Sequence, residues 1–131
     1  MAENKRKYEF SWDLIGTDMA VARHSLGPTL RIELYRLLQY TIRDILEQRY
    51  GTAEADDVFK AAGALAGKAF FEKFCTEAKD VSALAKILQD SFKLLGLGIF
   101  RVESAAPDSS AFYLTVDEAL DCSGLPDFDG V

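Results

Sequence analysis

The side chains that could carry out nucleophilic chemistry are few in this sequence. His24 is the only histidine, so a Ser-His-Asp triad, or a pair with Cys75 or Cys122, would have to use it. The sequence contains no G-x-S-x-G nucleophile elbow and no local cysteine-protease signature. We therefore interpret His24 as a loop residue, hydrogen-bonded or exposed, and predict that the protein is not an enzyme.

The same residues give little support for a metal or another cofactor. Cys75 and Cys122 lack the short C-x₂₋₄-C spacing of zinc ligands, and haem-ligating histidines usually project from an ordered element. Cys75 follows a predicted helix end, where a cysteine is most often a small core residue. Cys122 should be the more exposed cysteine, and its acidic neighbours do not favour a reactive thiolate. With no Walker loop and no G-x-G-x-x-G motif, we expect no cofactor and no metal.

Small residues concentrate in the middle of one predicted helix, residues 53–74. A glycine in a helix interior costs about 1 kcal/mol relative to alanine, so Gly63 and Gly67 should serve a purpose. They either let another backbone come close or leave room for a ligand beside the helix. Phenylalanines flank them, although core packing is the commoner role of such residues. The candidate ligand-pocket residues are Phe59, Gly63, Gly67, Phe70 and Phe74.

The bulk composition is that of one globular domain and excludes several functions. Of the 131 residues, 49% are hydrophobic and 27% charged, which is enough for one core and excludes disorder. A net charge of −6 argues against nucleic acid, because phosphate neutralisation needs clustered lysine and arginine. No apolar run approaches the ~20 residues of a membrane span, and no signal peptide precedes the cysteines. We expect a single cytoplasmic domain, residues 1–131, without nucleic-acid or membrane partners.

Hydrophobic periodicity predicts the framework that would hold the candidate residues. Residues 8–14 alternate aromatic and polar side chains, which predicts an N-terminal strand, or an extended segment, laid on the core. Residues 16–27 are expected to form an irregular connector. Leucines and isoleucines at helical spacing predict a long amphipathic helix that opens around Pro28 and ends at Gly51. Thr52 should cap the next helix, which is apolar on more than one face and is expected to be the most buried helix.

A third helix and a hairpin complete the predicted framework. Asp80 should cap a helix over residues 81–95 that ends at Gly96, and two strands follow at residues 97–103 and 111–117. Helices followed by a hairpin are typical of the α+β class, here an N-terminal strand and three helices packed on an antiparallel β-hairpin or sheet. The residues expected on a buried face of the last strand are Phe112, Leu114 and Val116.

Several segments, taken together, resemble the 4-vinyl reductase domain family, which is described as hydrocarbon-binding. The two most specific are residues 35–40 (YRLLQY) and residues 121–126 (DCSGLP). The resemblance covers essentially the whole chain. The other matching segments are residues 8–14, Leu26-Gly27, Glu33-Leu34, Ala62-Gly63 with Gly67 and Phe70, and residues 95–99 (LGLGI).

This resemblance implies an α+β ligand-binding fold shared with vesicle-tethering (TRAPP) subunits and haem-based nitric-oxide sensors. Its relatives include aromatic-effector sensor domains of bacterial transcription activators and a protein tied to bacteriochlorophyll vinyl reduction. They are commonly dimeric and bind an apolar ligand between helices and sheet. Family members continue beyond the segment matching residues 121–126 into a cysteine-rich zinc site. We therefore expect this chain to match the N-terminal part of such a domain.

Three functional hypotheses follow from the residues and the resemblance. The leading one is a signalling sensor domain that binds a small apolar, aromatic or hydrocarbon-like molecule and works as a homodimer. The alternative is a dimerising protein-interaction module with no small ligand, in which the second helix and the hairpin pack against another copy. The third, an enzyme related to vinyl reduction, is disfavoured because no motif for a nicotinamide or flavin is present.

Overall fold

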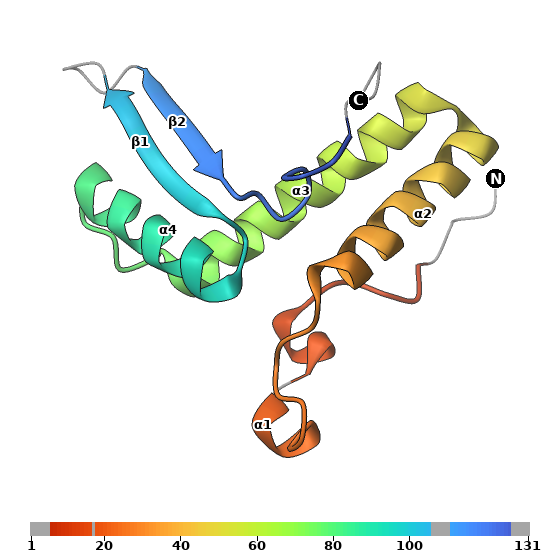
Figure 1. Cartoon of the computed structure of the whole chain (residues 1–131), viewed down its shortest axis with the longest axis horizontal. Coiled ribbons are helices and arrows are strands. Elements are labelled where there is room, and N and C mark those ends of the chain that lie inside the picture. The colour runs from red at the N-terminus through yellow and green to blue at the C-terminus, as the bar shows by residue number, and fades with distance from the viewer. Residues whose placement is uncertain (1–5, 17, 106–110, 127–131) are drawn as a thin grey trace.

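The computed structural model describes residues 6–16, 18–105 and 111–126. The predicted α+β class is confirmed. The long helix α3 runs through the middle of the molecule, with α2 beside its first half and with α4 and the hairpin near its other end (Figure 1). The elements in chain order are a 3₁₀ turn at Trp12–Ile15, α1 at Met19–Ala22, α2 at Ile32–Tyr50, α3 at Thr52–Phe74, α4 at Val81–Leu95, β1 at Ile99–Ala105 and β2 at Phe112–Asp117.

Helices α2 and α3 form an antiparallel pair joined at Gly51. This glycine has φ of 87°, a conformation that side-chain-bearing residues rarely adopt, and its N–H donates to the Glu47 carbonyl. Gly51, not Thr52, is the N-cap of α3, and the Thr52 hydroxyl instead donates to the Glu47 carboxylate. Helix α2 begins at Ile32, later than predicted, because the backbone before it is still extended. A single glycine therefore makes the turn between the two helices.

Helix α4 and the hairpin follow the sequence prediction closely. The Asp80 carboxylate accepts from the Ala83 N–H at 2.8 Å, and Gly96 closes the helix in the left-handed conformation with φ of 75°. Strands β1 and β2 are antiparallel, with Val102 opposite Leu114 and an irregularity just after Val102. They begin one or two residues later than predicted. The prediction agrees with the structure because α4 and the hairpin depend on residues that are close together in the sequence.

The predicted N-terminal strand is wrong. Residues 6–11 form no ladder, and Trp12 opens a 3₁₀ turn instead. The Trp12 indole N–H donates to the Ala69 carbonyl of α3 at 3.1 Å, and the Lys73 ammonium lies 4.4 Å from the indole ring centroid. A helix surface offers no free ladder of N–H and C=O groups, so the aromatic side chains make the attachment and the backbone does not. The connector predicted after it contains the short helix α1.

The best-packed region of the molecule is a chain of aromatic rings that we call the aromatic cluster. Consecutive ring centroids lie between 4.8 and 6.0 Å apart, distances typical of edge and tilted aromatic pairs. Phe100, the last ring of the cluster, is buried. Cys75, which follows Phe74 in the sequence, is also buried, as predicted. In order, the rings of the aromatic cluster are Phe10, Trp12, Phe74, Phe70, Phe92 and Phe100.

Two burial predictions are wrong. Helix α3 was expected to be the most buried helix, but apart from the buried Ala55 most of its side chains are exposed, whereas about half of the α4 side chains are partly buried. The apolar side chains of β2 are between 39% and 52% exposed, because α4 packs on β1 and leaves β2 at the open edge of the two-stranded sheet. The periodicity identified which side chains share a face, but burial depends on a covering element that the described part of the chain does not supply.

Candidate functional site

An apolar groove of about 390 Å³ lies between α2 and α3. Its position follows from the antiparallel pairing of the two helices, because the small side chains of α3 face bulkier side chains of α2. A Cβ atom built on Gly63 would meet nothing within 4 Å, so the missing side chain leaves free space. The groove is lined by Tyr35, Leu38, Gln39 and Ile42 of α2 and by Phe59, Ala62, Gly63 and Ala66 of α3.

Gln39 gives the groove one unsatisfied polar group. Its Oε1 atom is buried and accepts no hydrogen bond from the part of the chain that the structure describes. A buried acceptor without a donor costs about 1–3 kcal/mol, and this cost favours a turn of the Gln39 amide toward the groove, where the oxygen can accept from an O–H or N–H of a ligand. The groove therefore combines an apolar lining with one polar group that fixes orientation, which is the usual composition of small-molecule sites.

Charged side chains anchor both ends of this groove. At the Gly51 end, the Arg43 guanidinium contacts the Asp56 carboxylate at 2.6 Å and the Glu47 carboxylate at 3.2 Å. The hydrogen bond with Asp56, followed by the smaller effects of both carboxylates, raises the pKa of Arg43. The same guanidinium lies 5.7 Å from the Phe59 ring centroid, so it holds that ring at the groove wall.

At the other end, α2 binds the segment that follows β2. Arg36 donates to the carbonyls of Leu120 at 2.8 Å and Ala119 at 3.2 Å, and the Tyr40 hydroxyl donates to the Asp121 carbonyl. Burial, and secondarily the negative charge of Asp121, raises the pKa of Tyr35. Like any tyrosine phenol, that of Tyr35 is protonated at neutral pH, and it is available as a hydrogen-bond donor on the groove lining.

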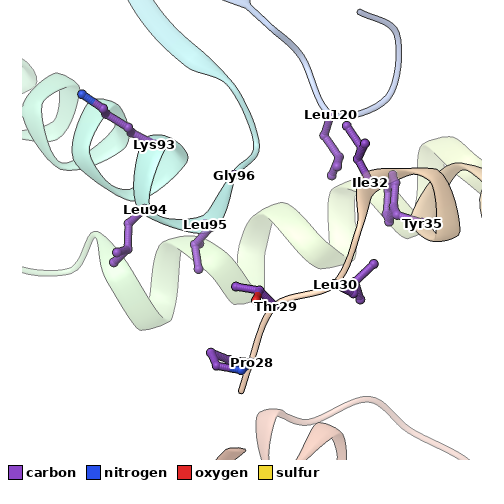
Figure 2. Close-up of a pocket in the computed structure, with 10 residues that line it drawn as sticks. All are labelled: Pro28, Thr29, Leu30, Ile32, Tyr35, Lys93, Leu94, Leu95, Gly96 and Leu120. Carbon is purple, nitrogen blue, oxygen red and sulfur yellow. The ribbon is translucent and has the colours of Figure 1, made fainter. Parts of the chain in front are cut away.

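Tyr35 also borders a second hollow, of about 360 Å³, shown in Figure 2. Its lining comes from the connector before α2, the end of α4 and the segment after β2. The Lys93 ammonium points away from Leu95 and Thr29, so its charge is not directed into the hollow (Figure 2). The polar side chains of Thr29 and Tyr35 line this hollow, but it includes no buried side-chain atom without a hydrogen-bond partner among the described residues, so it is a weaker candidate than the α2–α3 groove.

A third hollow, of about 190 Å³, lies between α4 and the hairpin. Its lining is almost entirely apolar and includes the exposed side chains of β2. No charged or amide side chain lines it, so it offers no means of orienting a small ligand. Its lining residues are Val81, Leu84, Ala85, Leu88, Phe100, Val102, Phe112 and Leu114.

The five residues predicted for the ligand pocket do not share one place. Phe59 and Gly63 line the α2–α3 groove. Phe70 and Phe74 belong to the aromatic cluster, with ring centroids 4.8 Å apart, and a Cβ on Gly67 would meet open space. The sequence analysis did not identify the α2 wall of the groove. The available signal was a second row of residues at helical spacing on α2, formed by Tyr35, by Gln39 four residues later and by Ile42 seven residues later.

The candidate chemical residues are spread over the molecule. His24 lies in the exposed turn between α1 and α2, Cys75 is buried at the end of α3, and Cys122 is exposed, as predicted. Desolvation raises the pKa of the Cys75 thiol. Within residues 6–16, 18–105 and 111–126, no three histidine, cysteine or acidic side chains are grouped so that they could hold a metal ion.

Comparison with known proteins identified no relative of this chain. No family model matches the chain, and no curated protein or solved structure matches it at a significant level. Among the described residues, no helix has both the length and the apolar character needed to cross a membrane. The geometry of the groove is therefore the main basis for a functional proposal.

Proposed function

We propose that this protein binds a small apolar molecule in the groove between α2 and α3. The observation that carries the proposal is the groove itself, in which an apolar lining and the space beside Gly63 surround the unsatisfied Gln39 oxygen. Its volume of about 390 Å³ falls in the lower part of the usual range for ligand sites. The resemblance to the hydrocarbon-binding 4-vinyl reductase domain family supports the same ligand class.

The lining specifies the chemistry of the ligand. An aromatic or short hydrocarbon body fits the apolar walls, and a single hydroxyl or amine can donate to Gln39. The protonated Tyr35 phenol can serve as a donor to a carbonyl or ether oxygen. A charged ligand is disfavoured, because the groove lining contains no ionised side chain to compensate its desolvation.

We propose a sensor or carrier role in a reducing cytoplasm for this binding activity. Both cysteines are free, one buried and one exposed, which agrees with a compartment that does not oxidise thiols. No nucleophile or general base lines the groove, so binding without turnover is the simpler activity. A ligand between the helices would change how α2 and α3 pack, and this change could be transmitted to a partner.

Native mass spectrometry of the freshly purified protein, beside a denatured control, tests the proposal directly. An additional small mass on the native species that is lost on denaturation would support it. Titration with naphthalene and 1-naphthol, followed by ligand-observed NMR, then tests the apolar body and the single donor separately. A protein that carries no added mass and binds neither compound would refute the proposal, and a bare dimer would favour the interaction module without a ligand.

Two glycine variants provide a matched pair for this test. Gly63→Leu should fill the groove and abolish binding of 1-naphthol, whereas Gly67→Leu should leave it unchanged, because Gly67 does not line the groove. Both replacements lie in the interior of α3 and face open space, so they affect the helix alike. Gln39→Leu should reduce the preference for 1-naphthol over naphthalene by about ten-fold, the value of one lost hydrogen bond.

A further inference from the structure

Strand β2 has an outer edge that no other strand covers among the residues that the structure describes. Its inner edge pairs with β1, the strand on which α4 packs (Figure 1). Every second residue of an edge strand directs its backbone N–H and C=O groups away from the sheet. The outer edge of β2 therefore offers backbone donors and acceptors to a further strand.

Strand β2 lacks the usual features that protect an edge strand from pairing. Such edges commonly carry a proline, a lysine, a bulge or a charge on the covered face. The six residues Phe112–Asp117 include neither proline nor lysine, and the irregularity of the ladder lies on β1, between Val102 and Ser104. The β2 side chains on the face toward α4 are all apolar. This edge is consequently open to strand pairing.

The hollow of about 190 Å³ between α4 and the hairpin suits the side chains of an added strand. Phe112 and Leu114 of β2 line it together with apolar side chains of α4, and they remain 39% and 52% exposed. A small ligand would find no orienting group there, whereas an added strand is oriented by its backbone hydrogen bonds. Every second side chain of that strand would face the hollow and should be apolar.

The opposite face of the hairpin is polar, and its groups are already paired with each other. The Thr115 hydroxyl donates to the Glu103 carboxylate at 2.8 Å, and the Arg101 guanidinium lies 3.3 Å from the Asp117 carboxylate. An added strand would continue this polar face toward solvent. Its side chains should therefore alternate between apolar residues toward α4 and polar residues on the other side.

The charges at the C-terminal end of β2 favour a basic partner. No lysine, arginine or histidine follows Arg101 in the sequence. Asp117 pairs with Arg101, whereas Glu118 and Asp121 are exposed and form no ion pair within the described part of the chain. Arg36 contacts the backbone carbonyls between these two residues and not their carboxylates. A basic side chain at this end of an added strand would therefore be attracted.

We propose that β2 binds an extended segment of another protein as a third, antiparallel strand. The segment would carry apolar side chains at every second position and basic residues just before the strand. Antiparallel pairing continues the pattern of β1 and β2 and places these basic residues beside Glu118. A second copy of β2 fits less well, because neither it nor the residues after it include a base. This surface shares no lining residue with the α2–α3 groove, so it is a separate site.

Fluorescence anisotropy of a labelled synthetic peptide, titrated with the full chain, tests this surface. The probe has lysines at its N-terminus, followed by alternating valine and threonine, and should bind with a Kd below about 1 mM. Replacing the lysines with glutamates should weaken binding about five-fold at low ionic strength, because the carboxylates after β2 then repel the peptide. Absence of binding at about 1 mM would overturn the proposal. Equal binding of both peptides would overturn the basic character of the partner.

Backbone methylation of the probe tests strand pairing without any change in the protein. In an extended peptide, the amides of the valines lie along one edge and those of the threonines along the other, so methylating either set removes the donors of one edge. One of the two isomers should lose at least about ten-fold in affinity, and the other should bind like the probe. Loss in both isomers, or in neither, would overturn strand addition.

Two lysine substitutions on β2 locate the site on the protein. Leu114→Lys places a charge in the hollow and should lower the peptide affinity at least about ten-fold. Tyr113→Lys places the same charge on the opposite face and should change it by less than about three-fold. Both residues are more than half exposed, so neither change removes a buried side chain. Equal weakening by the two variants would overturn the location.

Sedimentation equilibrium distinguishes the proposed partner from a second copy of this chain. Leu114→Lys should leave the oligomeric state of the wild type unchanged, because the edge of β2 is free in the protein alone. A wild-type dimer that Leu114→Lys converts to a monomer would overturn the proposal, since a second copy would then occupy the edge.

Discussion

The α2–α3 pair and the aromatic cluster are both apolar, but the cluster brings large rings into contact whereas the pair leaves an open groove. In the cluster, rings from the N-terminal segment, α3, α4 and β1 touch one another, and Phe100 is only 8% exposed. Along α2–α3, the facing residues of α3 are alanine and glycine, and leucines of α2 remain about half exposed. Large side chains fill the space between elements, whereas small ones leave it free for something else.

The two regions also differ in what holds them together. The cluster is held mainly by ring contacts, whose strength comes from buried apolar area. The α2–α3 pair has a polar contact between its helices at the Gly51 end, where Arg43 pairs with Asp56, and at the other end Arg36 attaches α2 to the segment after β2. The middle of the pair is consequently the part that can adapt to a ligand or a partner without breaking the fold.

The largest expected effect lies in the cluster. Phe100→Ala should lower the free energy of unfolding by about 3 kcal/mol, because it removes a buried ring and leaves a cavity. Phe71→Ala, which removes a ring that is 49% exposed, should lower it by less than about 1 kcal/mol. Urea unfolding followed by circular dichroism measures both, and equal losses would contradict the contrast between the two sites.

Two glycine substitutions should change the stability of the protein in opposite directions. Gly98→Ala should destabilise by about 2 kcal/mol or more, because its Cβ would lie 2.6 Å from the Val116 side chain and its φ is 149°. Gly63→Ala should stabilise by up to about 1 kcal/mol, because the space beside it is open and alanine favours the helix. Thermal unfolding of both variants measures these changes in stability. A destabilised Gly63→Ala variant would mean that no free space remains between α2 and α3 at this position.

Arg36 attaches α2 to the segment after β2, so its removal should have an intermediate effect. Arg36→Ala loses two hydrogen bonds to backbone carbonyls after β2 and should lower the free energy of unfolding by about 1–2 kcal/mol. Arg101→Ala, which removes an exposed ion pair with Asp117, should change it by less than about 1 kcal/mol. Guanidinium unfolding of both variants compares them, and the reverse order would show that the segment after β2 is held by other contacts.

The smallest effect concerns Cys75 and pH. Burial raises the pKa of this thiol in the folded protein, so folding favours its neutral form. Its contribution to stability is complete below the pKa of the unfolded thiol, about 8.5, and is lost as the pH rises toward the folded pKa. Cys75→Ala should flatten this alkaline decline, whereas Cys122→Ser should not, because Cys122 is exposed. Thermal unfolding between pH 7 and 10, a range spanning the thiol pKa of about 8.5, provides the measurement.

Local signals in the sequence were sufficient for much of the fold. The Asp80 cap, the left-handed Gly96 and the apolar spacing between them correctly predicted α4, because each signal acts within one or two turns. The end of α2 at Gly51 was predicted for the same reason. Two of the five proposed pocket residues, Phe59 and Gly63, line the groove, since helical spacing alone places them on one side of α3.

Tertiary contacts determined the remaining features, which are the N-terminal segment, the aromatic cluster and the groove. Residues 8–14 alternate like a strand, but a strand needs a neighbouring edge, and the surface that they meet is the helix α3. Phe70 and Phe74 joined the aromatic cluster because Phe92 and Trp12 reached them from distant parts of the chain. The groove, likewise, requires α2 to face α3 in one particular register. Residue spacing determines which side chains share a face, whereas the elements that pack against that face determine whether it is buried, open or available to a partner.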